Sequence, residues 1–328
     1  MEGVLSWWAR VCASSSAARF VDVSLRGIGQ VMFQDNPLSG LLFFIAMAWG
    51  SYFAGTPQVA IGGVVAIVAA KVTALWLRVE PADLGAGLYG FNAYLIGLAL
   101  PTFLAPTPLL WAYVVLGGAV SVPATIGIAN VCRSWGVATL TAPFVLVTWL
   151  LLLASHAFSA IEGSGLPMSD AIKPIDPTAA NPIELKGFAE GVVKSIGQVF
   201  LSESILAAVL LLAGLAVNSI PAALFAIAGA MVAVATAHVL GAESNLITGG
   251  LLGFSPVLTA IALGAVFYKP CAKSALYALV GTIFTVVAQS AMNVLFTPFA
   301  IPALTAPFVL VTWLFLLPRQ KFDPAPAA

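Results

Sequence analysis

Charged side chains are scarce in this sequence. Only 8% of its 328 residues are Asp, Glu, Lys or Arg, whereas a soluble domain has roughly 25%. A soluble fold of this size could not cover its surface with so little charge, so we expect most of the surface to face lipid. The formal net charge is zero, which provides no basic stripe for nucleic acid and excludes that class of partner.

Cysteine and histidine are also rare. Cys12, Cys132 and Cys271 are widely separated and form no CxxC pair, so we interpret them as free packing thiols and not as disulfides or metal ligands. His156 and His238 occupy unrelated positions, which disfavours an ammonia pore lined by paired histidines. No Walker loop, GxSxG elbow or HExxH helix occurs. We expect no enzyme activity, cofactor or metal.

Apolar residues, by contrast, make up 61% of the chain, and its mean hydropathy is +1.04. A spanning helix needs about 20 mostly apolar residues. The runs that meet this requirement or approach it lie at 20–34, 37–56, 58–79, 107–130 and 136–157 in the first half, and at 190–213, 216–239, 241–253 running into 254–269, 272–295 and 300–318 in the second. We therefore predict an all-α integral membrane protein.

Two stretches interrupt this pattern. Residues 87–101, GLYGFNAYLIGLALP, are too short to span before Pro101, so we predict a tilted or re-entrant helix there. Residues 158–188 are polar and rich in proline, which predicts a linker outside the membrane. The expected organisation is a first repeat over 1–157, this linker, a second repeat over 189–318 and a tail over 319–328.

The two halves repeat each other. The segment LTAPFVLVTWL occurs at 140–150 and again at 304–314, IGQVMF at 28–33 matches IGQVFL at 196–201, and LYGFNAYLIGLAL at 88–100 matches LLGFSPVLTAIAL at 251–263. An odd number of spans in each repeat would insert the halves from opposite sides of the membrane. The prediction is two inverted repeats of five spanning helices, each with one short tilted helix, and a pore at the repeat interface.

The doubled segment is expected in the protein interior, because lipid contact alone would not conserve Thr, Pro and Trp. Pro143 and Pro307 should break helical hydrogen bonds beside Thr141 and Thr305, and such backbone is tolerated in lipid only when it is buried or lines a cavity. We expect the two threonines to lie close together near the bilayer midplane. Thr148 and Thr312, seven residues later, are expected to hydrogen-bond to backbone.

Charged residues test the topology. The positive-inside rule places both termini in the cytoplasm, since most short flanking segments with Lys or Arg then fall inside; these residues are Arg10, Arg19, Arg133, Lys269, Lys273, Arg319 and Lys321. Arg78 is expected outside and disagrees with the rule. Asp35 and Glu203 occupy equivalent positions and are interpreted as helix-end charges, which disfavours a proton or sodium relay.

These paired segments resemble the urea transporter family, which is known for a repeated L-P-x-x-T-x-P-F signature. The second copy is IPALTAPF at 301–308, with Ile in place of Leu, and the first is VATLTAPF at 137–144, which lacks the leading Leu-Pro. The resemblance covers about 20–318 and is to a bacterial member. It implies a homotrimer in the cell (inner or plasma) membrane, with one pore in each protomer.

The resemblance also implies a set of pore residues. Phe91 and Phe254 would form slot walls with Leu95 and Leu258, Gln30 and Gln198 would bind the solute beside Val31 and Val199, and Thr141 and Thr305 would lie at the centre. Phe33 resembles a slot residue, although its repeat partner is Leu201. Urea is flat, neutral and rich in N–H donors, so an aromatic slot edged with oxygen atoms would replace its water.

The function implied is passive conduction of urea, and possibly of small analogues, down its gradient. Three alternatives remain at this stage: an ion-coupled secondary transporter, a channel for ammonia or small amides, and a membrane scaffold without transport. A coupled transporter would need a charged site at the repeat interface, and a scaffold would need no symmetric polar residues. The partners expected are urea and the lipid bilayer.

Overall fold

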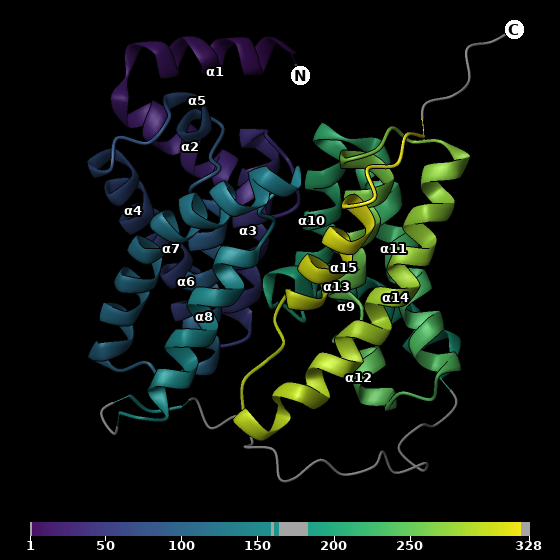
Figure 1. Ribbon diagram of the computed structural model, residues 1–328. Helices are drawn as coiled ribbons and strands as arrows, with labels where there is room; N and C mark the ends of the chain where they lie inside the picture. Colours follow the sequence, from purple (N-terminus) through teal and green to yellow (C-terminus); the bar gives the residue numbers. More distant parts are fainter. Residues whose placement is uncertain (1, 159–160, 164–182, 323–328) are drawn as a thin grey trace, which may run out of the picture.

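The protein folds as a bundle of helices (Figure 1). The computed structural model describes residues 2–158, 161–163 and 183–322, so most of the predicted linker and the last six residues lie outside it. The first-half helices are α1 (Glu2–Ser14), α2 (Ser16–Gln30), α3 (Pro37–Phe53), α4 (Pro57–Trp76), α5 (Pro81–Gly85), α6 (Phe91–Phe103), α7 (Pro108–Trp135) and α8 (Ala142–Ser155).

The second half follows the same order from the second copy of each repeated segment. Its elements are α9 (Leu185–Gly197) with η2 (Gln198–Phe200), α10 (Ile205–Asn218), α11 (Ile220–Val239), α12 (Ser244–Thr248), α13 (Phe254–Ile261) with η3 (Ala262–Val266), α14 (Ala272–Phe296) with η4 (Thr297–Phe299), and α15 (Ala306–Leu316). The described residues contain no named strand, which confirms the all-α prediction for that part of the chain.

Four helices are long and apolar enough to cross a bilayer unaided: α4, α7, α11, and α14 continued by η4. They confirm the runs predicted at 58–79, 107–130, 216–239 and 272–295. The other apolar helices, α3, α6, α8, α13 with η3, and α15, are 10–17 residues long. Helix length therefore does not establish the predicted count of ten spans.

Helix α2 does not cross the molecule, so the span predicted over 20–34 is wrong. The helix follows α1 directly, and at its other end the Nε2 of Gln30 donates to the Ala86 carbonyl, 3.1 Å away, just after α5. Figure 1 shows α1 and α5 at the same end of the molecule, here named the α1 end. Both ends of α2 thus lie toward the α1 end.

Helix α6 crosses instead, although 87–101 appeared too short. It begins after α5, and Leu104 at its far end forms an antiparallel bridge with Gly163 at the opposite end, here named the linker end. The first eleven residues of α6 are all buried. Helices α4 and α6 can approach closely because glycines lie at the contact. A Cβ on Gly97 would lie only 2.2 Å from the Gly62 carbonyl oxygen. The length rule assumes a helix in lipid, whereas α6 is surrounded by protein.

The stretch predicted as one span over 190–213 is also interrupted. Helix α9 with η2 and helix α10 are inclined by 73° to each other. Leu201, with a left-handed φ of 60°, ends the first, and the Oγ of Ser204 accepts from the Ala207 N–H at 3.3 Å to cap the second. Helix α9 begins inside the predicted linker, and 241–253 holds only the short α12.

The repeated segments have the same unusual backbone. Left-handed residues recur in matched pairs, which are Phe33 (φ 62°) with Leu201 (60°), Leu140 (53°) with Leu304 (52°), and Gly136 (71°) with Ala300 (50°). Positive φ is uncommon outside glycine and is strained for bulky side chains. The duplicated sequence therefore imposes the same local turns in both halves.

Helices α3 and α10, one from each half, pack in opposite directions. At one end the Asn36 Nδ2 donates to the Asn218 Oδ1 at 3.2 Å, and the Asn218 Nδ2 donates to the Gln34 Oε1 at 3.0 Å. Between the halves, Phe43 and Phe200 form an edge-on pair with ring centroids 5.4 Å apart. This packing joins the halves and leaves a second junction, between α8 and α15, for the site.

Candidate functional site

The two copies of the duplicated segment meet in the interior. The Oγ1 atoms of Thr141 and Thr305 lie 2.7 Å apart and share one hydrogen bond, and both residues are buried. The predicted proximity of these threonines is confirmed. Each threonine immediately precedes its helix, α8 or α15, so the helix N-termini converge on this contact.

The tryptophans of the segment form a reciprocal pair of hydrogen bonds across the same junction. The Trp149 Nε1 donates to the Pro302 carbonyl at 2.9 Å, and the Trp313 Nε1 donates to the Ala138 carbonyl at 2.8 Å. Donor and acceptor positions in the two bonds are related by the repeat. The tryptophan of each copy thus donates to backbone just before the other copy. Both bonds need tryptophan at the same position, which explains why the segment occurs twice.

The expected role of the prolines is wrong. Pro143 and Pro307 lie in the first turns of α8 and α15, where the missing N–H breaks no helical bond. The carbonyls of Thr141 and Thr305 are engaged normally, since they accept from Val145 and Val309 at 3.0 Å. The unusual backbone beside the threonines lies instead at the left-handed Leu140 and Leu304, with φ of 53° and 52°.

Thr148 and Thr312 were expected to bond to backbone, and this is also wrong. Both residues are fully buried, and neither Oγ1 has a hydrogen-bond partner among the described residues. Thr148 follows Thr141 by seven residues, close to two helical turns, so it lies on the side of α8 that begins at Thr141. A pattern of sequence spacing cannot show which neighbouring carbonyl is free to accept.

The two glutamines have equivalent environments. As the Gln30 Nε2 donates to Ala86, so the Gln198 Nε2 donates to the Gly249 carbonyl, also at 3.1 Å. Neither Oε1 atom has a partner among the described residues, so each glutamine retains an acceptor. A fixed amide with a free carbonyl oxygen can accept a hydrogen bond from a solute N–H.

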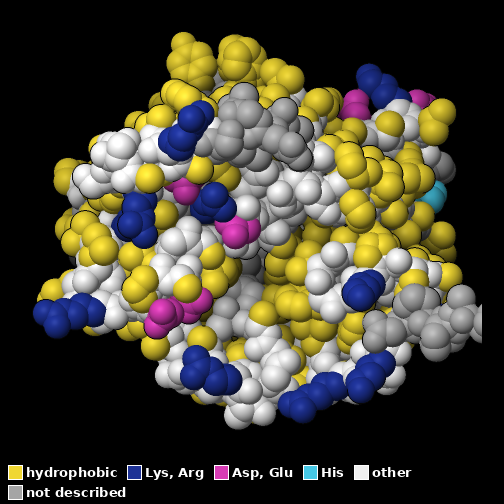
Figure 2. Space-filling model, turned by 90° about the horizontal axis from the view of Figure 1, so that it is seen from above, with side chains coloured by type: hydrophobic (Ala, Val, Ile, Leu, Met, Phe, Trp, Pro, Cys, Tyr) yellow, Lys and Arg dark blue, Asp and Glu magenta, His cyan; other side chains and the backbone are white. Residues whose placement is uncertain are grey.

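Five of the predicted residues line one cavity of about 640 Å³; they are Gln30, Val31, Phe33, Phe91 and Thr141. Phe267 and Phe308 line it too, and both meet Phe33 edge-on, with ring centroids 5.9 Å and 6.2 Å away. Figure 2, which looks onto the α1 end, shows this face hollowed near its centre.

The remaining predicted residues, Leu95, Gln198, Val199, Phe254, Leu258 and Thr305, do not line this cavity. Leu95 and Leu258 are buried in the core, with 2% and 0% of their surface exposed. The structure therefore brings five first-half residues together at the α1 end, and Thr305 reaches this group only through its contact with Thr141.

Sequence reasoning missed several lining residues. Phe308 ends the recognised signature and could have been found from it, whereas Phe267 lies in no repeated motif and its position depends on the fold. The rim carries Asp83, Arg133 and Tyr89. Burial, together with the nearby Asp83 and Glu80 carboxylates, raises the pKa of Tyr89, so its hydroxyl stays neutral.

Comparison with known proteins identifies the family of the chain. The family model described as "UT: Urea transporter" matches residues 21–320. The chain belongs to the urea transporter family. Proteins of this family are transporters and not enzymes, so this member is a multi-pass membrane protein of that kind.

Named relatives agree with the family assignment. The chain is 29% identical over 310 residues to "Urea transporter 1" of Ovis aries, covering 93% of this chain and 78% of the relative. It is 28% identical over 303 residues to "Urea transporter 1" of Rattus norvegicus, covering 91% and 77%. The bacterial origin expected from the sequence stays a prediction.

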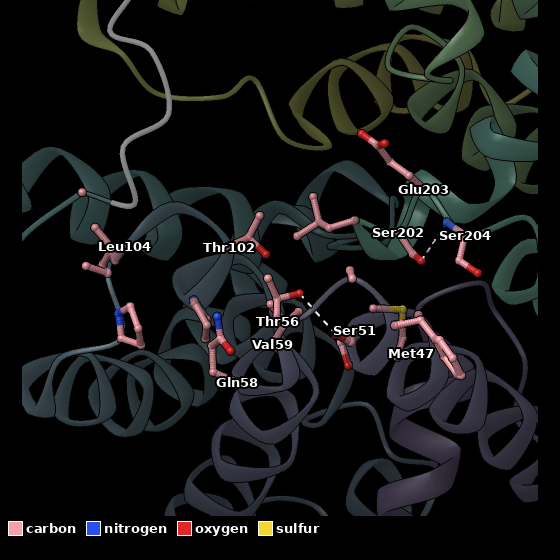
Figure 3. Close-up of a pocket in the computed structure, with 18 residues that line it drawn as sticks. Met47, Ser51, Thr56, Gln58, Val59, Thr102, Leu104, Ser202, Glu203 and Ser204 are labelled. Atoms are coloured by element: carbon pink, nitrogen blue, oxygen red, sulfur yellow. Dashed lines mark hydrogen bonds between the residues drawn. The ribbon is translucent and has the colours of Figure 1, made fainter.

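A second, wider cavity of about 940 Å³ lies at the linker end (Figure 3). It is lined by the turn between α3 and α4, the end of α6 and the turn before α10. Hydroxyl groups are frequent there, and the Thr56 Oγ1 donates to the Ser51 carbonyl at 3.5 Å. Leu201, the repeat partner of Phe33, lines this cavity. In this transporter the two partner residues thus line cavities at opposite ends.

The two equivalent carboxylates, Asp35 and Glu203, lie just before α3 and α10. The Arg26 guanidinium contacts both Asp22 and Asp35, at 2.8 Å and 2.7 Å, and Asp22 also accepts from the Trp8 indole at 2.7 Å. Glu203 forms no ion pair among the described residues and is exposed. This arrangement agrees with the interpretation of Asp35 and Glu203 as helix-end charges.

One cation was missed by sequence reasoning. Lys71, on α4, is only 8% exposed, and its Nζ donates to the Phe20 carbonyl and, at 3.1 Å, to the Ser24 Oγ. It also lies 3.8 Å from the centre of the Phe20 ring. Lys71 thus attaches α4 to α2, the helix that ends in Gln30. Arg78 follows α4 at the α1 end, so its predicted location on the other side is wrong.

Proposed function

We propose that this transporter conducts urea passively through a narrow pore at the junction of two inverted repeats. The observation that carries the proposal is the buried Thr141–Thr305 contact of 2.7 Å, flanked by reciprocal tryptophan bonds. Equivalent residues meet in this way only near an axis that relates the two halves. An axis in the membrane plane would put the contact near the bilayer midplane.

The proposed path begins in the cavity at the α1 end. Edge-on rings of Phe33, Phe267 and Phe308 would select a flat solute, while the Gln30 amide and the Thr141 hydroxyl would replace part of its hydration. Stripping water from an amide without replacement costs about 2–7 kcal/mol. Gln198, Val199, Phe254 and Leu258, with the core residue Leu95, would provide the equivalent path toward the linker end, and Thr305 would complete the centre.

Among the described residues, no ion pair or charged hydrogen-bond partner involves the central threonines, which supports passive flux. Thr141 and Thr305 contact each other, and the ion-paired Asp35 and the exposed Glu203 lie at helix ends. Moving a charge through such an apolar region would require a compensating partner. A neutral solute requires none.

The cellular orientation is part of the proposal. Figure 2 shows Lys and Arg side chains around much of the rim at the α1 end, which is the distribution expected of a cytoplasmic face. Arg78 also lies at this end, so it no longer disagrees with the positive-inside rule. We propose a location in the cell membrane with both termini cytoplasmic, and a homotrimer as implied by the family resemblance.

Urea uptake by proteoliposomes tests the function. Purified protein, reconstituted without any ion gradient, should equilibrate urea much faster than protein-free liposomes in a stopped-flow light-scattering assay. Flux should depend on the urea gradient alone. Uptake that needs a sodium or proton gradient would establish the coupled alternative, and equal rates with and without protein would exclude conduction.

A solute panel in the same assay separates the channel alternatives. Urea and flat small amides should pass, whereas bulkier non-planar solutes should not, because the aromatic rings limit thickness. Ammonia flux that exceeds urea flux would favour an ammonia channel over the proposed function.

A further inference from the structure

An apolar groove of about 530 Å³ lies on the side of the molecule between α7–α8 and α14–α15. The duplicated segment provides its floor in matched pairs, among them Leu146 with Leu310 and Trp149 with Trp313. Leu146 and Leu310 are 46% and 44% exposed, so the groove is open outward. We name it the α8–α15 groove; it is separate from the cavity at the α1 end.

The groove cannot stay empty in a bilayer. Water gains nothing from an apolar concavity, and a void would forfeit the dispersion contacts of its lining. Gly127 shows how open the space is, since a Cβ added there would meet no atom within 4 Å. A flexible hydrocarbon chain is the occupant that a bilayer supplies.

One end of the groove is cationic. Trp135 lines it at the α1 end, and the Arg319 Nη2 donates to the Trp135 carbonyl at 3.0 Å. Arg319 is exposed, and it contacts no carboxylate among the described residues. At the opposite end, the lining residues Trp149 and Phe296 have tilted rings with centroids 4.4 Å apart and carry no charge.

We propose that the α8–α15 groove binds an anionic phospholipid, with an acyl chain along the groove and the headgroup phosphate against Arg319, beside Trp135. Arginine binds phosphate through a forked pair of N–H donors. Tryptophan at the membrane surface, as at Trp135, suits the junction of chain and headgroup. The proposal does not depend on which solute the transporter conducts.

Lipid binding to the purified full-length protein tests this. Native mass spectrometry should retain the anionic lipid POPG in preference to zwitterionic POPC, and POPG should raise the unfolding temperature more. Arg319→Gln should weaken POPG binding roughly fivefold, since a basic residue near the surface contributes about that factor, and leave POPC binding unchanged. The Lys269→Gln/Lys273→Gln double variant, at the same end but outside the groove, is the matched control.

A second variant tests the part of the groove proposed to hold the acyl chain. Gly127→Leu fills open space and improves helix propensity, so the protein should fold, yet it should lower the binding of both lipids. Val64→Phe, on the outer face of α4, is its control. Equal retention of POPG and POPC, or full POPG binding by Gly127→Leu, would overturn the proposal. Disulfide-linked copies formed by Leu146→Cys in membranes, and not by wild type, would show that a second copy covers the groove and would also overturn it.

Discussion

At the scale of single residues, the central contact consists of two hydroxyls that satisfy each other. Thr141 and Thr305 are 3% and 4% exposed, so neither has access to bulk water when its partner is removed. A buried polar group left without a partner costs about 1–3 kcal/mol, whereas removing both partners can be nearly neutral. The pair should therefore behave differently in stability and in transport.

Thr141→Val alone should destabilise the protein by about 1 kcal/mol or more because Thr305 loses its partner. The Thr141→Val/Thr305→Val double variant should be less destabilised than the sum of the singles, yet conduct urea several-fold more slowly, since both central hydroxyls are gone. Thermal unfolding in detergent and stopped-flow flux measure the two effects. Additive stability losses would mean that the hydroxyls do not interact in solution.

A second prediction at this scale concerns the glutamines. Gln30→Leu and Gln198→Leu should leave the fold intact and slow urea flux, because each removes a polar partner for a dehydrated solute. Gln58→Leu, in the wide cavity at the linker end, is the control and should have a smaller effect. If both single variants and the double variant conduct at the wild-type rate, the glutamines do not belong to the path.

At the scale of helices, α7 and α14 are followed by the same left-handed turn, but a different residue type forms the turn in each half. Gly136 caps α7 with φ 71°, and its N–H bonds to the Arg133 carbonyl at 3.2 Å. Ala300, its partner after η4, has φ 50°. A left-handed conformation costs an L residue about 1–2 kcal/mol relative to glycine, although glycine also loses more entropy on folding.

Gly136→Ala should therefore lower the unfolding temperature, because alanine would have to adopt the left-handed φ of 71°. Ala300→Gly should raise it slightly, with a gain of about 0.5 kcal/mol after the entropy term. Thermal unfolding of both variants beside wild type checks the signs. If Ala300→Gly lowers the unfolding temperature, the packing of the alanine methyl group contributes more stability than the left-handed backbone conformation costs.

At the scale of the whole molecule, the arrangement of charge predicts uncoupled transport. Among the described residues, ion pairs join Arg26 to Asp22 and Asp35 and Lys186 to Glu190, and none includes a residue of the central contact. Urea flux in proteoliposomes should be unchanged by an imposed pH gradient or membrane potential and should produce no current. Accumulation of urea against its gradient would contradict this and would direct attention to Asp35 and Glu203.

Composition and internal repetition were sufficient to predict the structural class of this protein and its central contact. Scarce charge and long apolar runs determined a helical membrane protein, because surface chemistry must match the solvent that it meets. The doubled LTAPFVLVTWL predicted that Thr141 and Thr305 would lie together, and their hydroxyls do. Duplication carries such information because equivalent residues that lie near the axis relating the two halves must face each other across it.

Only the tertiary structure decided which short helices cross. By length alone α2 and α6 look alike, with 15 and 13 residues, yet α2 returns to the α1 end and α6 passes through. The difference lies in neighbours: α6 is enclosed by protein, while α2 is attached to α4 through Lys71. Likewise, Phe267 joined the ring cluster only through packing. Sequence periodicity describes the solvent around a helix, and it cannot specify contacts between side chains distant in the chain.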